Sequence, residues 1–532
     1  KDARALLMPL FGSVALVFFV ACVNVAGLFV ARGLQRHREY AMRAALGASR
    51  LRLFRQLLTE SGVLSMVSAV AGMGVAAAVV VLFKALGGQA VPRADAVHVG
   101  WPVFAFGCAS ALLAALVAGL LPALRASSLQ HSHRLRGTRS TAGRTERRLL
   151  AAIATVQIVC TVALLAGAVL LIRTASNLAG VRPGYATENV LAVTVTSVTP
   201  NSFKAFHTQV LARVAALPGV VRTAFVWGLP LTGNKWMGTL ELVAASGASP
   251  GDQLSLPMRS VTPDYFPLME IRVVDGRLFL PTDNADSPPV VVVNQALAKR
   301  YFLNESPLGR QMQFAGDPKR RLEIVGIVED TRTESLSEQP GPEIYLPFWQ
   351  SGAFSKHLVL RAGGDPRALA GAVRREVHAV DPTAAVEHVT TMAQIRRESV
   401  ATRTFAMRLL VGFSVLATTL ALVGIYGVLS LSVGSRMKEI AVRKAIGAQH
   451  LDILRLILSE GCRMIVVGVF IGALVAVLLG RALENYLFGV TTADPASLAV
   501  AGVVFAVAAL GASLVPAARA ARSDLPSALH QD

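Results

Sequence analysis

The stretch that decides the fold occurs twice in the chain. Residues 38–48 read REYAMRAALGA and residues 438–448 read KEIAVRKAIGA, so equivalent positions lie 400 residues apart. The correspondence continues as far as Glu60 and Glu460. Each stretch follows one long apolar run and precedes another. A repeat of this kind indicates two copies of one structural unit.

Both copies have the same spacing of charge and glycine. A glutamate precedes an arginine by four residues, which on a helix is the favourable order for an ion pair. A glycine four residues later suits the left-handed position at a helix C-terminus. Each copy therefore predicts a short charged helix, a glycine break and a second helix that enters the next apolar run. The candidate site residues are Glu39, Arg43, Gly47, Glu439, Arg443 and Gly447.

The simplest interpretation of one such segment is an amphipathic helix at the membrane surface that only fixes orientation. Two matching copies in equivalent places favour a shared task, such as docking a partner.

The composition indicates a membrane protein. The chain has 532 residues, of which 53% are hydrophobic and 16% charged, whereas soluble domains carry about 25% charged residues. Buried core helices of a soluble protein are the alternative, but these are usually shorter and amphipathic. Seven runs are long enough to cross a bilayer: residues 8–30, 57–85, 101–123, 149–172, 405–433, 461–484 and 498–518.

The net charge of +19 is concentrated in the segments after the first, third, fifth and seventh runs. By the positive-inside rule these basic segments are cytoplasmic, which places residues 173–403 outside the cytoplasm. A basic protein can also bind nucleic acid, but the asymmetry between loops favours membrane orientation, and we expect no nucleic-acid partner.

The third run of each copy also ends alike, with PALRA at 122–126 and PAARA at 516–520. The fold class expected is therefore an α-helical membrane protein with seven transmembrane helices, two three-helix repeats and an α/β extracytoplasmic domain. The expected domains are a first three-helix unit (1–130), a basic cytoplasmic linker with the fourth span (131–172), the extracytoplasmic domain (173–403) and a second three-helix unit (404–532).

These residues resemble the permease domain of ABC transporters of the macrolide-exporter and FtsX type. The run EIAVRKAIGA at 439–448 is very close to the most recognisable stretch of that family, whereas the first copy has Tyr40 and Met42 in place of aliphatic residues. Seven further motifs follow the order of the exporter-type periplasmic core: PGV (218–220), PDYF (263–266), GRLF (276–279), VVVVN (290–294), PLG (307–309), IVGIV (324–328) and IYLP (344–347).

The resemblance implies that the two repeated segments are coupling helices that touch a cytoplasmic ABC ATPase subunit. It implies a multi-pass protein of the bacterial inner membrane that couples ATP hydrolysis by that separate subunit to export or extraction of an unknown extracytoplasmic substrate. The arrangement is similar to the duplicated orphan permeases of acidobacterial type. Since the chain begins at Lys1 just before a span, the family and the repeat together imply a parent with eight spans and two outside domains.

Residues 173–403, taken alone, predict a mixed α/β domain. Apolar residues at helical spacing predict helices over 203–217 and 369–380. Runs rich in β-branched residues predict strands at 190–195, 290–293 and 322–328. Asn294 follows one of these strands and is placed to cap the next helix.

No catalytic motif, metal site or cofactor site is expected. The sequence has no phosphate-binding GxxxxGK[ST] loop, no HExxH and no GxSxG, so ATP hydrolysis would belong to another chain. Asp275, Asp283 and Asp286 could form a carboxylate cluster, but solvation of a turn is the favoured interpretation. Trp227 and Trp236 could form a binding rim, but packing is favoured.

Inside the spans, Asn24 is the notable polar residue, and an interhelical hydrogen bond is the favoured role. Gly468 and Gly472 give one GxxxG pattern. Arg173 and Glu484 lie at span ends, where their charges can reach water.

Three functions remain open from the sequence. The first is an ABC permease subunit. The second is a non-transporting scaffold or signalling protein that regulates an envelope enzyme through its outside domain. The third and least favoured is a membrane-anchored enzyme.

Overall fold

The computed structural model describes residues 2–35, 42, 50–87, 98–110, 142–197, 203–234, 236–243, 253–302, 305–351, 356–435, 440, 442–443, 446 and 449–522. The chain divides into two compact units. A helical unit is formed by residues 1–177 and 403–532, and an α/β unit by residues 178–402. By chain connectivity, α5 leads into the α/β unit and α11 leads out of it.

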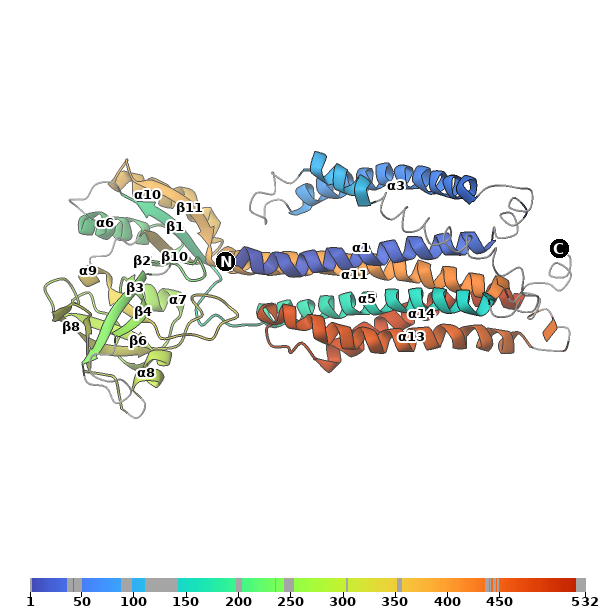
Figure 1. Cartoon of the computed structure of the whole chain (residues 1–532). Coiled ribbons are helices and arrows are strands. Elements are labelled where there is room, and N and C mark those ends of the chain that lie inside the picture. The colour runs from blue at the N-terminus through green and yellow to red at the C-terminus, as the bar shows by residue number, and fades with distance from the viewer. Residues whose placement is uncertain are drawn as a thin grey trace. The chain divides into compact units, whose positions relative to one another are not determined.

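Long helices build the helical unit (Figure 1). Among the described residues these are α1 (Asp2–Gln35), α3 (Arg50–Gly87), α5 (Ala142–Ala179), α11 (Met392–Ser435), α13 (His450–Gly480) and α14 (Pro495–Arg522), with the short 3₁₀ helix η6 (Arg481–Tyr486) after α13.

Four described helical segments are long and apolar enough to cross a membrane. They are Arg148–Ala179, Arg403–Gly434, His450–Glu484 and Pro495–Arg519, and they coincide with the last four expected spans. Shorter apolar helical segments, Leu10–Val25, Met66–Val81 and Trp101–Ser110, lie within the first three, while residues 111–123 are outside the described part of the chain. The helices fit a multi-pass membrane protein, and the count of seven stays a prediction.

The outer faces of α13 and α14 have the character of lipid-facing surfaces. Val466, Phe470 and Leu474 follow one another at four-residue intervals on α13 and are all exposed. On the opposite face of the same helix, Gly461, Gly468 and Gly472 are buried. Large apolar side chains outside and small ones inside are the pattern of helices that pack within a bilayer.

Helix α5 packs against α11, α13 and α14 in one buried cluster. Its Ala154, Ile158 and Val162 meet residues of all three helices there. A Cβ atom on Gly468 would lie 2.5 Å from Ile158 Cγ2, and one on Gly472 would lie 2.8 Å from Val162 Cβ and 3.1 Å from the Val159 carbonyl oxygen. The GxxxG pattern therefore marks the place where the backbone of α13 approaches α5.

Polar side chains also join the helices. The Ser414 hydroxyl of α11 donates to the Leu164 carbonyl oxygen of α5 at 3.0 Å. The Asn24 side-chain amide of α1 donates to the Leu420 carbonyl oxygen of α11, also at 3.0 Å, which confirms the expected interhelical hydrogen bond. Gln157 of α5 is buried nearby, and its Nε2 has no hydrogen-bond partner among the described residues.

The end of α5 that leads into the α/β unit is bound to the segment between α13 and α14. Arg173 pairs with Asp494, and Asp494 accepts hydrogen bonds from the backbone N–H and hydroxyl of Ser497 in the first turn of α14. The Asn177 amide donates to the carbonyl oxygens of Phe488 and Gly489 at 3.2 and 3.3 Å. The charge of Arg173 is thus paired with a carboxylate, and its position at a span end also lets it reach water.

The α/β unit begins and ends in a βαββαβ module. Its strands pair in the order β11-β1-β10-β2, all antiparallel, the order of a ferredoxin-like fold. Phe206, Val210 and Val214 of one helix and Val373 and Val377 of the other are buried on this sheet, which confirms both predicted helices. The elements are β1 (Val190–Thr196), α6 (Phe203–Ala215), β2 (Val220–Val226), β10 (His357–Ala362), η5 (Pro366–Leu369), α10 (Ala370–Val380) and β11 (Ala385–Thr391).

A closed ring of strands is inserted between β2 and β10. The strands pair in the order β4-β3-β7-β8-β6-β9, and the parallel pairing of β9 with β4 closes the ring. Strand β5 (Val273–Gly276) is added on β8. The ring consists of β3 (Trp236–Val243), β4 (Gln253–Val261), β6 (Val290–Asn294), β7 (Gln311–Phe314), β8 (Asp317–Val328) and β9 (Ile344–Pro347).

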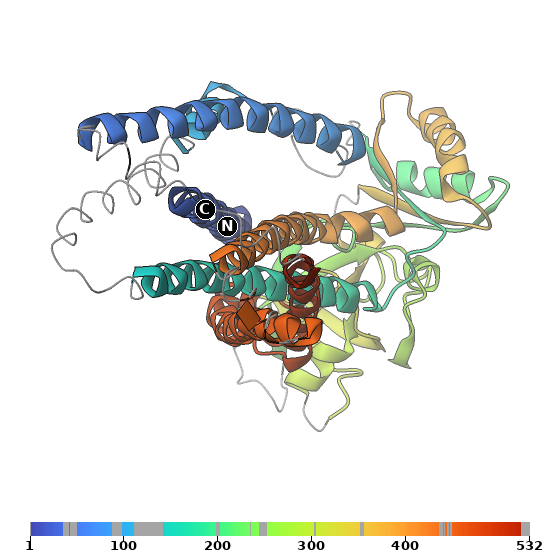
Figure 2. The ribbon, with the colours of Figure 1, turned by 90° about the vertical axis from the view of Figure 1, so that its right-hand side faces the viewer.

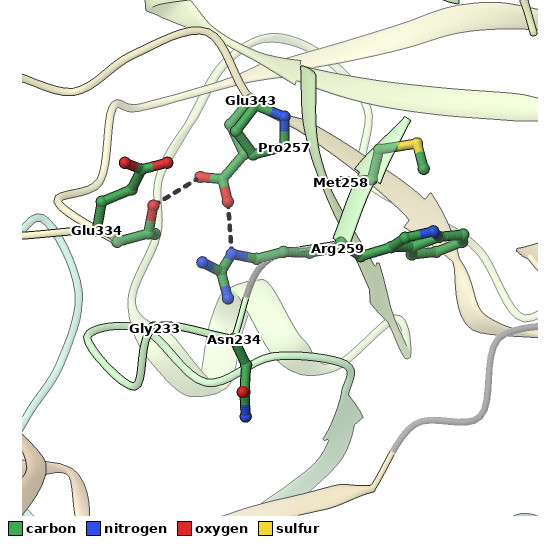
Figure 3. A pocket seen from close by; sticks show the side chains of 9 residues that line it. Gly233, Asn234, Pro257, Met258, Arg259, Glu334 and Glu343 are labelled. Atoms are coloured by element: carbon green, nitrogen blue, oxygen red, sulfur yellow. Dashed lines mark hydrogen bonds and ion pairs between the residues drawn. The ribbon is translucent and has the colours of Figure 1, made fainter. Parts of the chain in front are cut away.

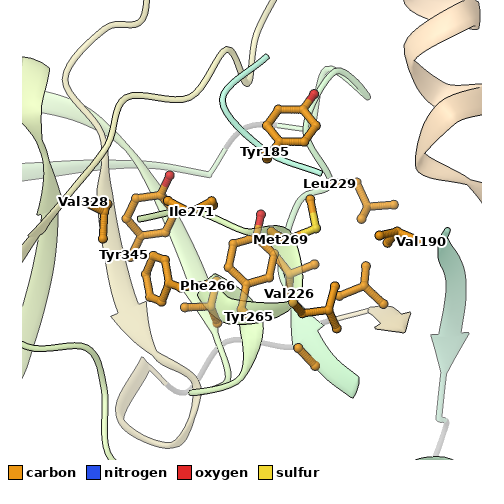
Figure 4. Close-up of a cluster of buried hydrophobic side chains, with 14 of the residues drawn as sticks. Tyr185, Val190, Val226, Leu229, Tyr265, Phe266, Met269, Ile271, Val328 and Tyr345 are labelled. Carbon is orange, nitrogen blue, oxygen red and sulfur yellow. The ribbon is translucent and has the colours of Figure 1, made fainter. Parts of the chain in front are cut away.

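Three short helices complete the inserted part: α7 (Tyr265–Met269), α8 (Gln295–Tyr301) and α9 (Phe348–Ser351). Asn294 caps α8 as predicted, because its side-chain oxygen accepts from the Leu297 N–H at 3.1 Å. Figure 4 shows the core around α7, where Tyr265, Phe266 and Met269 pack beside Tyr345.

His357 makes the stability of the α/β unit depend on pH. Burial, with the nearby charges of Lys356, Arg259 and His388, lowers the pKa of His357 from 6.5 to about 4. Between these two values the unfolded chain binds a proton that the folded unit does not, so stability is lost as pH falls from 6.5 towards 4 and changes no further below 4. The difference corresponds to about 3 kcal/mol.

We expect His357→Gln to remove most of this loss, measured as the free energy of unfolding followed by tryptophan fluorescence between pH 7 and pH 4. Three of the four tryptophans, Trp227, Trp236 and Trp349, belong to the α/β unit. His378→Gln on the exposed face of α10 is the control and should leave the pH profile unchanged. An unchanged profile in His357→Gln would contradict the assignment.

Candidate functional site

Of the six predicted site residues, the structure describes Arg443. Glu39, Arg43, Gly47, Glu439 and Gly447 lie outside the described residues, so the roles given to them stay predictions. Arg443 is helical and exposed.

Ile440 anchors the second repeated segment to the helical unit. Its side chain is 2% exposed and packs in the cluster that also contains Val433 of α11, Ile453 of α13 and Ala517 of α14. Ile440 therefore belongs to the same packed cluster as side chains of three of the long helices.

The same segment presents apolar side chains to its surroundings. Val442 is 55% exposed and Ile446 is 81% exposed. They belong to one helical turn, because the Ile446 N–H donates to the Val442 carbonyl oxygen at 3.0 Å. Met42, the equivalent of Val442 in the first copy, is also helical and exposed. Exposed aliphatic side chains next to an arginine form a surface suited to a protein partner.

Helix α13 begins immediately after this segment with a capping box. The Gln449 side chain accepts from the third backbone N–H of the helix, and the Gln449 N–H donates to the Asp452 carboxylate at 3.1 Å. The cap fixes where the chain turns from the exposed segment into the span. Sequence reasoning did not identify it, because Gln449 and Asp452 depart from the usual pattern of Ser or Thr followed three residues later by Glu or Gln.

Asp283, the buried member of the candidate acidic cluster, is engaged by groups of the α/β unit itself. Asp283 accepts from Arg277 at 2.7 and 3.2 Å and from the Leu280 N–H at 2.8 Å. Burial alone would raise the pKa of Asp283, but the hydrogen bonds from Arg277 and Leu280 lower it overall. Asp275 and Asp286 are exposed. Across the described ranges, no group of three or more His, Cys, Asp or Glu side chains could hold a metal ion.

A small surface pocket of the α/β unit contains a buried ion pair (Figure 3). The Arg259 Nε donates to Glu343 Oε1 at 2.5 Å, and another of its nitrogens donates to the Gly228 carbonyl oxygen. Burial lowers the pKa of Arg259, but the charge of Glu343 more than compensates and leaves that pKa raised. Arg259, which lines this pocket, is already neutralised by Glu343.

Trp227 and Trp236 of the α/β unit serve packing. Their ring centroids are 5.7 Å apart, and Trp236 packs against the core inside the strand ring. Both are half-buried, in agreement with the packing interpretation.

Two family models together match most of the chain. The model described as "MacB-like periplasmic core domain" matches residues 149–390. The model described as "FtsX-like permease C-terminal" matches twice, at residues 11–131 and 411–525. The chain belongs to the MacB/FtsX type of ABC-transporter permease.

Curated relatives agree with this family. The chain is 26% identical over 286 residues to the pyoverdine export ATP-binding/permease protein PvdT of Pseudomonas putida, which covers 50% of this chain and 41% of that protein. It is 25% identical over 294 residues to the macrolide export ATP-binding/permease protein MacB of Acinetobacter baylyi, which covers 53% and 43%. The chain thus spans less than half the length of these relatives.

Among solved structures, the periplasmic region of MacB from Actinobacillus actinomycetemcomitans matches 42% of this chain and 96% of that chain, at 14% identity and a TM-score of 0.29. The family assignment rests on the family models and the curated relatives. A MacB/FtsX-type permease is a membrane protein with an extracytoplasmic domain, and the role of the family is that of an ABC-transporter permease.

Proposed function

We propose that this chain is the transmembrane subunit that a separate cytoplasmic ATPase drives through the two repeated segments. The observation that carries the proposal is the arrangement at residues 440–446, where a buried isoleucine is tied to the spans while Val442 and Ile446 stay exposed. When a partner bound to this exposed surface moves, the packed isoleucine can transmit the movement to the long helices.

The same proposal gives a role to the other predicted site residues and to each domain of the chain. Glu39, Arg43 and Gly47 would form the first docking segment, and Glu439, Arg443 and Gly447 the second. The α/β unit would be the extracytoplasmic domain over residues 173–403, with permease units at 1–130 and 404–532 and a linker with the fourth span at 131–172. Seven spans in the inner membrane would orient both docking segments to the cytoplasm.

The conformational change driven by the ATPase would be transmitted along α5 and α11, because these helices connect the helical unit to the α/β unit. The Ser414–Leu164 hydrogen bond ties them to each other. ATP hydrolysis would be absent from this chain, which has no phosphate-binding loop. The cargo would be an extracytoplasmic molecule, and the substrates in the names of the relatives, pyoverdine and macrolides, give a range of small export substrates to test first.

The docking role predicts a specific loss of ATPase binding. We expect Ile446→Asp to weaken co-purification of the ATPase about tenfold or more, because a carboxylate in the centre of an apolar contact costs over 1.4 kcal/mol. Glu439→Ala combined with Arg443→Ala should lower ATP-dependent cargo movement in reconstituted vesicles. The measurement is the amount of an ATPase, identified by its phosphate-binding loop, that co-purifies with the chain.

Val221→Asp is the matched control, since Val221 is an exposed valine of the α/β unit. It should leave ATPase binding unchanged. Wild-type levels of ATPase binding and cargo movement in all the docking variants would overturn the proposal. Capture of an envelope hydrolase by the α/β unit without any cargo movement would instead favour the scaffold function.

A further inference from the structure

Two arginines of the helical unit lie at the ends of exposed apolar faces. The first is Arg481, whose backbone is still helical where α13 ends. It follows Leu474 by seven residues and Phe470 by eleven, which are about two and three turns of helix. Arg481 therefore shares a face with Phe470 and Leu474, and all three side chains are exposed.

Arg408 has the same placement on α11. It precedes Val415 by seven residues and Thr419 by eleven, so these three exposed side chains also lie on one face. On the opposite face of the helix, Ala417 and Ala421 are buried. Arg408 lies well inside α11, so the unpaired carbonyl groups of a helix end do not account for its charge.

The two arginines lie at one level of the helical unit. Helix α5 lies beside α11 and α13 (Figures 1 and 2). A Cβ atom on Gly167 of α5 would lie 3.4 Å from Leu410 Cδ2 and 3.7 Å from Leu483 Cδ1, and each leucine follows one of the arginines by two residues. This level is near the end of the spans that connects to the α/β unit, which matches the periplasmic core model. Both arginines therefore lie on the extracytoplasmic side.

The uncharged helix beyond each arginine has the length of a bilayer. From Arg408 to its end at Ser435, α11 carries no other charged residue and rises about 40 Å. A bilayer with its headgroups is about 40–45 Å thick. On α13 the residues between Arg463 and Arg481 are uncharged, and this distance is about 27 Å, close to the roughly 30 Å of the hydrocarbon core. Both arginines thus lie where hydrocarbon meets the headgroups.

Neither guanidinium has a partner in the described part of the chain. Arg408 and Arg481 form no hydrogen bond or ion pair with any other residue that the structure describes. Arg173, at the same end of the helical unit, differs from them because it pairs with Asp494. A guanidinium at headgroup level can instead bind a phosphate group, since its planar fork of N–H donors fits two phosphate oxygens.

We propose that Arg408 and Arg481 each bind the phosphate group of a phospholipid in the extracytoplasmic leaflet, with the acyl chains along the apolar side chains of the same helix face. The continuity of each arginine with such a face favours a lipid over a free anion, because a lipid presents phosphate and hydrocarbon together. Two lipids held at one level would fix the depth of α11 and α13 in the bilayer. The proposal does not depend on the docking of an ATPase.

Native mass spectrometry of the full chain in detergent tests the two lipid sites. The delipidated protein is titrated with dioleoyl phosphatidylglycerol, or with dioleoylglycerol, which has the same acyl chains and no phosphate. We expect Arg408→Gln with Arg481→Gln to weaken retention of the first two phosphatidylglycerol molecules about tenfold, because hydrogen bonds to charged groups are lost. Arg408→Lys with Arg481→Lys should keep most of the retention. Dioleoylglycerol should bind weakly, and equally to all variants.

Arg374→Gln with Arg375→Gln is the matched control. Both are exposed arginines of α10 in the α/β unit, so this variant loses the same charge outside the helical unit and should retain the lipid as the wild type does. Size-exclusion chromatography checks that each variant is monodisperse. If the double glutamine variant is not, Arg408→Gln and Arg481→Gln are measured singly, and each should lose one of the two retained lipids.

Three results would overturn the proposal. The first is equal retention of phosphatidylglycerol by the wild type and the glutamine variants. The second is displacement of the lipid by inorganic phosphate, which would identify a site for free anions. The third is an acidic protein that co-purifies with the wild type and is lost in the double glutamine variant, which would identify a protein-binding surface instead.

Discussion

Replacing Gly472 by leucine is expected to prevent the helical unit from packing. The added side chain would enter space held by Val162 and by the Val159 carbonyl oxygen, at 2.8 and 3.1 Å from the first added carbon. Backbone cannot move aside as the tip of a flexible side chain can, and valine is stiff at its Cβ atom. Overpacking of a core costs about 1–3 kcal/mol for a few added carbons and more where the backbone must shift.

The Gly468 position should behave in the same way. A Cβ there would lie 2.5 Å from Ile158, one turn from Gly472 on the same face. We expect Gly468→Leu combined with Gly472→Leu to abolish recovery of monodisperse protein in detergent, and Gly472→Ala to give an intermediate loss of thermal stability. The measurements are size-exclusion chromatography and the midpoint of thermal unfolding.

Gly412→Leu in α11 and Gly511→Leu in α14 are the controls. Both glycines are helical and have no other described atom within 4 Å of an added Cβ, so leucine there should be tolerated. A Gly472→Leu protein with the thermal midpoint of the wild type would show that α13 does not pack on α5 as described.

The spans could be predicted from the sequence because membrane insertion depends on local composition. A run of about 20 apolar residues suffices, and the last four runs are helices of that length. What each helix contacts could not be predicted. The GxxxG pattern of Gly468 and Gly472 was visible, but its partner α5 lies some 300 residues away in the chain. Gln157 was not recognised, because one amide in a long apolar run says nothing about which helix it faces.

In the α/β unit, too, local elements could be predicted from the sequence, whereas the pairing of distant segments could not. Helices were predicted over 203–217 and 369–380 because their apolar residues recur at helical spacing, and strands at 190–195, 290–293 and 322–328 because these runs are rich in β-branched residues. The structure has an element at each place, and the last of these strands begins five residues earlier, at Asp317. The other eight strands of the described chain were not predicted; in β3 and β4, for example, glycine, glutamate and proline interrupt the apolar pattern. The closure of the ring by β4 and β9 joins segments some 85 residues apart, and nothing local in either segment specifies that pairing.

At the candidate site, the repeated spacing located the segment but not the orientation of its side chains. Ile440, Val442 and Ile446 are all aliphatic, and an isolated helix gives no reason to bury the first and expose the others. Ile440 is buried because it joins the cluster that also contains residues of α11, α13 and α14. Tertiary packing, which the sequence alone does not specify, therefore separates the anchor from the docking surface.

Removal of the buried carboxylate in the α/β unit is the second change for which we expect a large loss. Glu343 is buried and pairs with the buried Arg259, while its other oxygen accepts from the Tyr345 hydroxyl at 3.2 Å and from Thr333 at 3.4 Å. Glu343→Gln leaves the arginine charge buried without a counter-ion. Loss of one member of a buried pair costs about 3–5 kcal/mol.

The expected result is a fall in the thermal midpoint of the α/β unit on the order of 10 °C, given that 1 kcal/mol corresponds to roughly 2–4 °C for a domain of this size. Tryptophan fluorescence follows the transition. Glu305→Gln is the matched control, because Glu305 pairs with Arg310 at 2.8 Å and both side chains are more than 40% exposed. Exposed pairs contribute about 0–1 kcal/mol, so that variant should unfold close to the wild type.

A double variant separates two contributions to the free energy of unfolding: the destabilisation caused by an unpaired buried charge, and the stabilisation that the ion pair itself provides. Arg259→Met with Glu343→Leu removes both charges and keeps similar volume, a change that is often neutral or stabilising for buried pairs. We expect it to recover much of the stability lost in Glu343→Gln. The Tyr345 and Thr333 hydroxyls would still lose their acceptor, which sets a residual loss of about 1–3 kcal/mol. A double variant less stable than Glu343→Gln would mean that the pair contributes through its hydrogen bonds to Gly228, Tyr345 and Thr333 more than through its charges.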